Sequence, residues 1–336
     1  MKHLSRTKIV ATIGPASGSK KILTQMIGSG LDIARFNFSH GKHSEFAKWA
    51  KIIRAIAKRK KREVKILQDL QGPRIRIGVD LPKKGLMLKK GSKVKVGFGK
   101  FKRGFLPIDY KGLVDDIKIG TLIMLSDGMV ELEIVKKEKD FAWARVKLSG
   151  KVFSRKGINI PNANLKISPI TEKDKADIKW GLKNKMDFIA LSFVKDEKDI
   201  TNLRKLTGKK IKLIAKIERP QALKNLKKIL KVADGAMVAR GDLGIEIRLE
   251  KIPNAQRKII DAARKAKKLV IVATQMMESM VGSPRPTRAE VSDIDTAVIE
   301  KADAVMLSEE TAIGLYPVES VKVMEKILEE AEKTGE

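Results

Sequence analysis

The sequence predicts an α/β fold, a TIM (β/α)8 barrel with a small antiparallel β-barrel domain inserted after the third strand. Eight short runs rich in Val, Ile and Ala alternate with amphipathic stretches long enough to form crossover helices. The alternation is interrupted once, at residues 75–157, where apolar and polar residues alternate in short pieces with Gly at the bends. We therefore expect the barrel at residues 1–74 and 158–336 and the inserted β domain at 75–157.

The eight apolar runs are the expected barrel strands. In order they are KIVATIG (8–14), LDIARFNFS (31–39), VKILQDL (64–70), DFIALSF (187–193), KLIAKIE (212–218), GAMVAR (235–240), LVIVATQ (269–275) and AVMLS (304–308). Stretches such as 44–61 and 254–268, which lie between runs, have helical periodicity. Eight strand–helix units are the number that closes a TIM barrel.

Composition excludes several classes of site. The 336 residues include no Cys and three His, so we expect neither disulfides nor thiolate or all-His metal sites, and any metal must have oxygen ligands. No apolar stretch is long enough to cross a bilayer, and the N-terminus lacks a signal-type core, which predicts a cytoplasmic protein without a membrane partner.

The formal net charge of +31 is the strongest compositional signal. Alone it would indicate a nucleic-acid partner. Lys and Arg are, however, spread along the whole chain, and only 4% of the residues are aromatic, so few side chains could stack on bases. We expect a solvated basic surface, and nucleic-acid binding is the weaker interpretation.

Polar residues stand at the carboxyl ends of most apolar runs. They are Arg35, Asn37, Ser39, Asp69, Ser192, Lys216, Glu218, Arg240, Asp242, Thr274 and Ser308. One such residue alone is readily explained as a helix cap. Because the active sites of TIM barrels lie at the carboxyl ends of the strands, their joint placement predicts an active site there.

Glu218 and Asp242 follow consecutive strands, so their carboxylates can converge on one divalent cation. Mg²⁺ and Mn²⁺ prefer such oxygen ligands, with substrate oxygens completing the coordination. Lys216 shares a strand face with Glu218 and could stabilise a phosphoryl group or an enolate. The structural alternative is that Glu218 only neutralises Lys216.

Ten sequence blocks closely resemble the pyruvate kinase family, in order over nearly the whole chain. They are TKIVATIGPAS (7–17), ARFNFSHG (34–41), GPRIRIG (72–78), KGINIP (156–161), ITEKDKADIKWGL (170–182), AKIERP (215–220), MVARGDLGIEI (237–247), ATQMMESM (273–280), RPTRAEVSDI (285–294) and MLSEETAIGLYPVE (306–319). The resemblance implies a TIM barrel whose inserted domain closes over the site as a lid.

The resemblance also implies the chemistry: transfer of a phosphoryl group from phosphoenolpyruvate to ADP, which gives pyruvate and ATP. Glu218 and Asp242 would bind Mg²⁺ or Mn²⁺. Lys216 would stabilise the phosphoryl group in transit and the enolate. Arg35 would hold the phosphoryl group, and Thr274 would support protonation of the enolate.

By the same resemblance, further residues would contact the two substrates. The residues expected to bind phosphoenolpyruvate are Ser192, Gly241, Asp242 and Thr274. Those expected to bind the nucleotide are Asn37, His40, Arg76, Lys156 and Asp127. Closure of the lid would exclude water, so that the phosphoryl group passes to ADP instead of being hydrolysed.

One departure concerns the monovalent cation. Family members that need K⁺ hold it with residues that match Asn37, Ser39 and Asp69, together with a Thr. Here the stretch reads DLQGPRIRIG (69–78), which places Leu70 and Arg74 in this region, as in members that work without K⁺. A fixed guanidinium can supply the positive charge of a bound ion, so we expect that K⁺ is not required.

Other departures concern Glu309 and the chain end. Glu309 stands where the family usually has Gly, and we expect its side chain to crowd a turn or the substrate pocket. The chain resembles a short form without the C-terminal regulatory domain, so regulation through that domain is expected to be absent. The region 285–298 resembles the barrel face that pairs subunits and predicts a homodimer.

Two other functions remain open at this point. Another phosphoenolpyruvate or pyruvate barrel, such as a C–C lyase, is compatible with the barrel residues, although the nucleotide-facing Asp127 and Lys156 argue against it. The second alternative is a non-catalytic, basic nucleic-acid-binding protein on the same scaffold. The intact set Lys216, Glu218 and Asp242 argues against that one.

Overall fold

The computed structural model describes residues 5–126, 128–161, 163 and 165–334. The chain forms two compact units, which we describe separately. The first comprises residues 1–72, 169–243 and 250–336, and the second comprises 73–168 and 244–249. The bounds of 75–157 that the sequence suggested for the inserted domain are narrower than the second unit.

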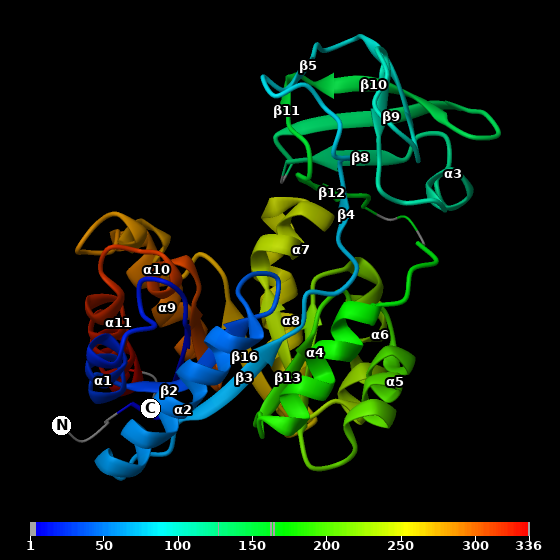
Figure 1. The fold of residues 1–336 in the computed structure, drawn as a ribbon. Coiled ribbons are helices and arrows are strands. Elements are labelled where there is room, and N and C mark those ends of the chain that lie inside the picture. Colours follow the sequence, from blue (N-terminus) through cyan, green and yellow to red (C-terminus); the bar gives the residue numbers. More distant parts are fainter. Residues whose placement is uncertain (1–4, 127, 162, 164, 335–336) are drawn as a thin grey trace. The chain divides into compact units, whose positions relative to one another are not determined.

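The first unit is a closed parallel barrel, as predicted (Figure 1). Its strands are β1 (Lys8–Thr12), β2 (Leu31–Asn37), β3 (Lys65–Asp69), β13 (Phe188–Leu191), β14 (Lys212–Ile217), β15 (Gly235–Ala239), β16 (Leu269–Ala273) and β17 (Ala304–Leu307). The order around the barrel is β1-β17-β16-β15-β14-β13-β3-β2. Each of the eight apolar runs contributes one strand, because strands covered on both faces are continuously apolar.

Helices alternate with the barrel strands along the chain. They are α1 (Lys20–Gly28), α2 (His43–Lys60), α4 (Glu172–Lys183), α5 (Glu197–Thr207), α6 (Pro220–Val232), α7 (Arg240–Glu246), α8 (Ile252–Lys265), α9 (Arg288–Ile299), α10 (Glu309–Ala312) and α11 (Pro317–Thr334), with 3₁₀ turns at Leu249–Lys251 and Glu278–Val281. Ser19, Thr171, Asp196 and Thr287 cap the starts of α1, α4, α5 and α9. No helix among the residues described has the length and apolar character needed to cross a bilayer.

Four Asp side chains join neighbouring strands at the end where the strands begin. The Oδ2 atoms of Asp32, Asp187, Asp234 and Asp303 accept hydrogen bonds of 2.8–2.9 Å from the backbone N–H of Ile9, Ile66, Leu213 and Val270. Each acceptor lies on or just before β2, β13, β15 or β17, and each donor is the second residue of the barrel strand that precedes it in the chain, β1, β3, β14 or β16. The pattern fixes the register at this end of the barrel.

The second unit contains a mixed β sheet of seven strands. In sheet order they are β4 (Ile75–Arg76), β12 (Gly157–Asn159), β8 (Leu122–Leu125), β9 (Val130–Lys137), β10 (Ala142–Leu148), β6 (Lys93–Gly97) and β7 (Phe105–Pro107). A separate pair joins β5 (Leu86–Leu88) and β11 (Gly150–Val152), and the short helix α3 spans Leu113–Asp116. The edge strands meet through an isolated antiparallel bridge between Ile77 and Ile108.

The expectation of a purely antiparallel insert is wrong for one strand pair. β6 and β7 pair in parallel, because the segment between them, 98–104, crosses back to the start of β6 before β7 begins. A buried apolar cluster, which includes Val96, Ile123, Leu132 and Val146, fills the unit. The insert therefore has a hydrophobic core of its own.

Candidate active site

A polar layer lies directly above an apolar layer inside the barrel. Val10, Ile33, Leu67 and Ile214, from four different strands, belong to one buried cluster. Because strand side chains alternate between faces, the residues two positions later point in the same direction. Those residues are Thr12, Arg35, Asp69 and Lys216. The same alternation puts Ser192 above Ala190.

Lys216 lies at the centre of this polar layer. Its Nζ is 2.8 Å from Glu218 Oε1 and 3.3 Å from Asp69 Oδ1, and it donates a 2.9 Å hydrogen bond to Ser192 Oγ. The residue is only 8% exposed, and both acids are 1% exposed. Two carboxylates from different strands therefore hold one buried ammonium group.

Arg35 extends the charged chain to the first strand. Its Nε and Nη2 atoms both lie 2.8 Å from Asp69 Oδ2, and its Nη1 donates a 2.8 Å hydrogen bond to Thr12 Oγ1. Asp69 thus separates two buried cations, Arg35 and Lys216. Two convergent cations at one point of the barrel are suited to a phosphoryl group, whose oxygens could replace the carboxylate contacts.

The pKa values reflect this mutual dependence. Burial alone would lower the pKa of Lys216, but the negative charges of Asp69, Glu218 and Asp242 outweigh it and raise the pKa. Burial would also raise the pKa of Asp69, yet Lys216 and Arg35 lower it below its usual range. Both Lys216 and Asp69 are therefore charged near neutral pH.

Glu218 behaves differently from Asp69. Burial raises its pKa, Lys216 opposes the shift, and the nearby negative charge of Asp242 adds to it. Its Oε2 accepts a 2.7 Å hydrogen bond from the N–H of Phe193, whereas the buried Oε1 accepts none, because Lys216 Nζ lies at ion-pair distance without hydrogen-bond alignment. A divalent cation would satisfy Oε1 and relieve the repulsion from Asp242.

These residues fit a Mg²⁺ site in which the substrate supplies part of the coordination. Among the residues described, no group of three or more His, Asp or Glu side chains is arranged to hold a metal on its own. Glu218 and the half-buried Asp242 provide two carboxylates. Mg²⁺ is commonly bound by one or two carboxylates together with substrate oxygens and water.

Thr274 follows β16 in a strained conformation. Its φ of 72° and the φ of 54° at Gln275 are both left-handed, which is costly for residues other than Gly. Thr274 Oγ1 accepts a 2.7 Å hydrogen bond from the N–H of Gly241 and donates one of 2.6 Å to the carbonyl of Ala273. The structure thus brings Thr274 and Gly241 together.

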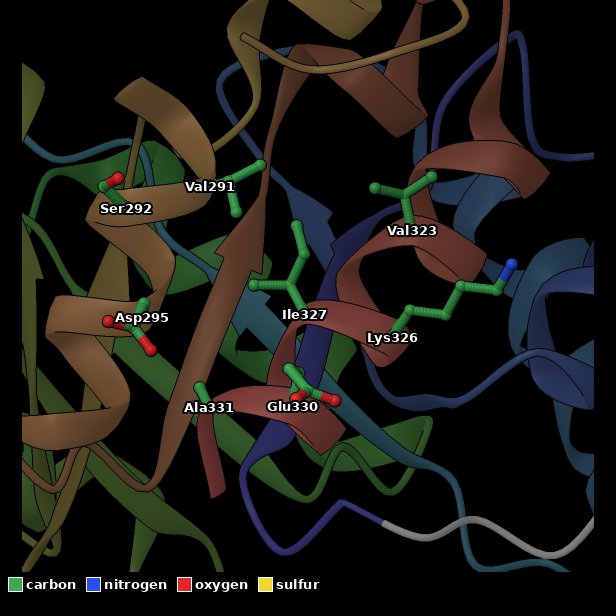
Figure 2. A pocket seen from close by; sticks show the side chains of 8 residues that line it. All are labelled: Val291, Ser292, Asp295, Val323, Lys326, Ile327, Glu330 and Ala331. Atoms are coloured by element: carbon green, nitrogen blue, oxygen red, sulfur yellow. The ribbon is translucent and has the colours of Figure 1, made fainter. Parts of the chain in front are cut away.

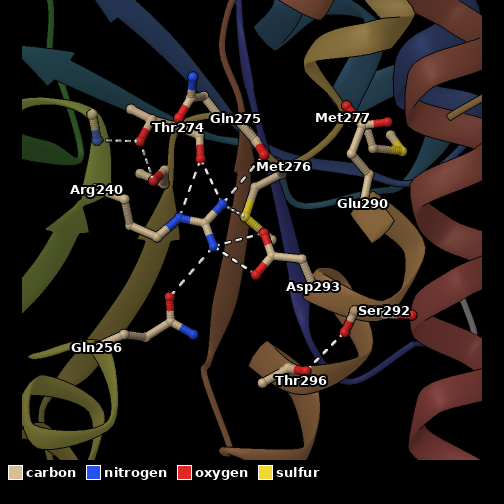
Figure 3. Close-up of polar contacts among 12 residues, drawn as sticks. Arg240, Gln256, Thr274, Gln275, Met276, Met277, Glu290, Ser292, Asp293 and Thr296 are labelled. Carbon is tan, nitrogen blue, oxygen red and sulfur yellow. Dashed lines mark hydrogen bonds and ion pairs between the residues drawn. The ribbon is translucent and has the colours of Figure 1, made fainter. Parts of the chain in front are cut away.

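Arg240 holds this strained turn from the other side (Figure 3). Its Nη2 donates a 2.7 Å hydrogen bond to the Thr274 carbonyl and a 3.3 Å one to the Gln275 carbonyl. Its Nη1 lies 2.7 and 2.8 Å from the two carboxylate oxygens of Asp293 on α9. Arg240 therefore connects the Thr274 turn to a surface helix.

The residues of the expected monovalent-cation region make separate contacts. Asn37 Oδ1 accepts a 3.1 Å hydrogen bond from the Ser39 N–H, and the Leu70 carbonyl accepts one of 2.7 Å from Ser192 Oγ. Leu70 offers no side-chain oxygen. Arg74 is exposed and belongs to the second unit.

The expected nucleotide-binding residues are divided between the units. Asn37 and the exposed His40 lie in the barrel, and the His40 N–H donates a 3.1 Å hydrogen bond to the Asn37 carbonyl. Arg76 and the exposed Lys156 lie in the second unit, where Arg76 Nη1 donates a 2.9 Å hydrogen bond to the Arg155 carbonyl. Asp127 lies outside the described residues.

The expectation that Glu309 crowds its turn is wrong, and its effect on the substrate pocket stays a prediction. Glu309 is exposed at the first residue of α10, and its φ is not left-handed, so a side chain is accommodated there. The neighbouring Glu310 is the buried acid. Its carboxylate accepts hydrogen bonds from the Ser308 and Met277 N–H groups, at 2.6 and 3.1 Å.

Sequence reasoning missed Thr12 and the function of Arg240 and Asp293. Thr12 is buried at the end of β1 and is the hydrogen-bond partner of Arg35. The strand-end rule that selected the other residues would have found it. Nothing in the sequence links Arg240 to Asp293, because the two residues are 53 positions apart and meet only when α7 and α9 come together in the folded chain.

Comparisons with known proteins agree with this geometry. The family model of the pyruvate kinase barrel domain matches residues 4–321. Pyruvate kinases from Agrobacterium vitis and Dictyostelium discoideum are 45% and 42% identical over 98% and 97% of the chain, which covers 70% and 66% of their own lengths. Pyruvate kinase 2 of a Synechocystis strain is 44% identical, and the chain covers 57% of its length. The chain belongs to the pyruvate kinase family of phosphotransferase enzymes.

Proposed function

We propose that this chain transfers the phosphoryl group of phosphoenolpyruvate to ADP, giving pyruvate and ATP, with Mg²⁺ or Mn²⁺ as cofactor. The observation that carries the proposal is the buried chain of alternating charges from Arg35 through Asp69 and Lys216 to Glu218. The charges of these four side chains sum to zero. A charged substrate would replace some of the contacts that they make with one another. The sequence similarity to pyruvate kinases over nearly the whole chain supports the same reaction.

Each residue contributes a separate effect. Arg35 and Lys216 would receive the phosphoryl oxygens from two sides and stabilise the charge that develops during transfer. Lys216 would then remain beside the enolate oxygen. When bound by Glu218 and Asp242, the divalent cation polarises the substrate oxygens that it coordinates.

Thr274 and Gly241 would place the other end of the substrate. The Gly241 N–H donates to Thr274 Oγ1, and the Thr274 hydroxyl donates to the Ala273 carbonyl, so a bound substrate would exchange these contacts for its own. We assign the substrate carboxylate to the backbone groups near Gly241 and Asp242. Thr274 would support protonation of the enolate, and Ser192, which already contacts Lys216, would contact the substrate. The nucleotide phosphates would bind Asn37, His40, Arg76, Lys156 and Asp127, with the second unit acting as the lid.

The proposal includes turnover without K⁺. Two observations support it: Leu70 provides no side-chain oxygen, and both carboxylate oxygens of Asp69 already face cations. Arg74 would supply the positive charge in place of the ion. The cytoplasm remains our expected location.

A homodimer through the barrel face at 285–298 is a further part of the proposal. α9 in this region exposes Val291 and Ile299. Val291 also faces a groove of about 580 Å³ between α9 and α11, whose apolar lining includes Val323 and Ile327 (Figure 2). Sedimentation that detects only monomer at micromolar concentrations would contradict the dimer. Val291→Glu should dissociate it, because the change buries a charge in an apolar contact.

The activity is tested by a coupled assay of pyruvate formation in which phosphoenolpyruvate, ADP and Mg²⁺ are varied. We expect turnover that requires all three, and Glu218→Gln should raise the Mg²⁺ concentration needed for half-maximal rate. A matched control is Glu172→Gln, an exposed helix-start acid. Pyruvate formation that does not depend on ADP would contradict the proposal and favour a lyase.

A further inference from the structure

The barrel concentrates its positive charge at one end. Five segments connect the end of a helix to the start of the next strand. They are residues 58–65, 183–187, 204–212, 227–234 and 264–268. Their 35 residues contain 20 Lys and Arg but only three Asp and Glu, a net charge of +17 out of +31 for the chain. We call these five segments the basic end.

The end that carries the candidate active site is close to neutral. The strand-to-helix segments 13–19, 37–42, 70–72, 192–196, 218–220, 240–243, 274–287 and 308–316 contain five Lys and Arg and six Asp and Glu, a net charge of −1. The excess positive charge of the barrel is thus not explained by its anionic substrates. It lies at the opposite ends of the strands.

The five segments form one continuous surface. They precede β3, β13, β14, β15 and β16, which are neighbours in the barrel. Cross-contacts join four of them: Lys65 Nζ lies 3.7 Å from Asp187 Oδ1, the Lys212 N–H donates a 3.2 Å hydrogen bond to the Asp187 carbonyl, and Arg204 forms an ion pair with Asp234. Positive charges that are dispersed along the sequence are therefore gathered in space.

Most of these charges are free to meet a partner. The few acids of the basic end are already used, because Asp187 and Asp234 accept backbone hydrogen bonds at the strand starts. The residues exposed without an ion pair among the described contacts are Lys58, Arg59, Lys60, Lys61, Lys183, Lys185, Lys205, Lys209, Lys210, Lys212, Lys227, Lys228, Lys231, Arg264, Lys265 and Lys267. Neutralising helix carboxyl ends requires about one cation per helix, so this number exceeds what the helix dipoles explain.

Aliphatic side chains are exposed among the charges. Leu182, Leu206 and Val232 close α4, α5 and α6 and are 37%, 44% and 36% exposed. No aromatic residue occurs in the five segments, and Lys outnumbers Arg by 16 to 4. Base recognition relies on Arg and stacking aromatics, whereas a Lys-rich surface with exposed aliphatic residues suits phospholipid headgroups.

We propose that the basic end is a docking surface for an anionic phospholipid bilayer, which the protein binds peripherally. Lys side chains would meet the phosphate headgroups, and Leu182, Leu206 and Val232 would enter the interfacial region. The active-site ends of the strands, at the opposite end of the barrel, would remain open to substrates. The inference does not depend on the proposed catalytic activity.

Sedimentation with vesicles tests the inference. Vesicles of phosphatidylcholine with about 30% phosphatidylglycerol should bind the protein at about 50 mM salt and should bind less of it at about 300 mM salt. Vesicles of pure phosphatidylcholine should bind little protein at either salt concentration. The variant K183Q/K205Q/K209Q/K210Q should weaken binding at least about tenfold, since each headgroup-facing Lys contributes about fivefold. The matched control K83Q/K84Q/K89Q/K90Q removes equal charge from exposed positions of the second unit.

The control separates the surface from overall charge. The inference is overturned if both quadruple variants lose binding equally, or if wild-type protein fails to bind anionic vesicles at low salt. L182S/L206S should also weaken vesicle binding and leave RNA binding unchanged. If instead a duplex RNA binds more tightly than the vesicles, and L182S/L206S changes neither affinity, the surface is a nucleic-acid site and the inference is wrong. Unchanged circular dichroism and thermal unfolding would confirm that all variants are folded.

Discussion

Lys216 and Glu218 stand two positions apart at the end of one strand, and the Nζ of the first lies 2.8 Å from the Oε1 of the second. Both are buried, and Asp69 holds the same ammonium group from a different strand. The pair is thus part of a network that crosses the barrel. Changing either residue alters a charge balance in which Arg35 also takes part.

Lys216→Met should lower kcat by about 10²- to 10³-fold, because it removes a cation positioned for the charge that develops on the phosphoryl group. It should also destabilise the fold by about 3–5 kcal/mol, since Asp69 and Glu218 lose their shared partner. The coupled pyruvate assay and thermal unfolding measure the two effects. Lys212→Met, at the exposed start of the same strand, is the control and should change neither. Normal turnover by Lys216→Met would refute the proposed function of Lys216.

Arg240→Lys should lower kcat about tenfold with little change in stability, because an ammonium group cannot contact the Thr274 carbonyl and Asp293 with the same geometry. Relaxation of the left-handed turn would displace Thr274. Steady-state kinetics with phosphoenolpyruvate varied will separate kcat from KM. Arg257→Lys, an exposed residue on α8, should behave like the wild type. An Arg240→Lys variant with full kcat would show that the turn keeps its conformation without the guanidinium.

Activity should be equal in Na⁺, K⁺ and tetraalkylammonium salts, because Leu70 contributes no oxygen and Arg74 is proposed to replace the cation. L70T/R74E should become dependent on K⁺, with at least about tenfold activation, since it restores a ligand and removes the guanidinium. Initial rates at constant ionic strength measure the effect. Strong activation of the wild type by K⁺ would contradict the expectation.

Glu332→Gln should destabilise the protein by about 1–2 kcal/mol near pH 7, because the carboxylate accepts backbone hydrogen bonds of 2.6–2.9 Å from Arg6 and Thr7. Burial would raise the pKa of Glu332, but these hydrogen bonds outweigh burial and lower it. Because its pKa is lower in the folded state, the ionised Glu332 carboxylate stabilises the fold at pH values above the unfolded pKa of 4.5. This stabilisation is lost as the pH falls through the folded pKa.

Urea unfolding at pH 7 and at about pH 4 measures this pH dependence. The difference between wild type and Glu332→Gln should shrink at the lower pH. Glu330→Gln, whose partner Lys333 is exposed, should cost less than about 0.5 kcal/mol at either pH. A difference that stays constant with pH would show that the effect arises from packing.

Much of the candidate site was predictable because it follows from a local rule. Side chains two positions apart share a strand face. The position of each apolar run therefore predicts which polar residue lies directly above the apolar layer inside the barrel. That rule selected Arg35, Asp69 and Lys216 directly. It could not reveal that Asp69 would bridge the other two, since their strands are brought together only when the barrel closes.

The sequence by itself determined the number of barrel strands, the place of the insert and the residue types at each barrel strand end, since hydrophobic periodicity and polar strand ends are local properties. Tertiary structure decided the partners: which carboxylate holds Lys216, how Arg240 reaches Asp293, and how β7 pairs in parallel. It also decided where the positive charge gathers. Parallel strands joined by helices bring every helix-to-strand segment to one end of the barrel, so charges that are scattered along the chain converge there.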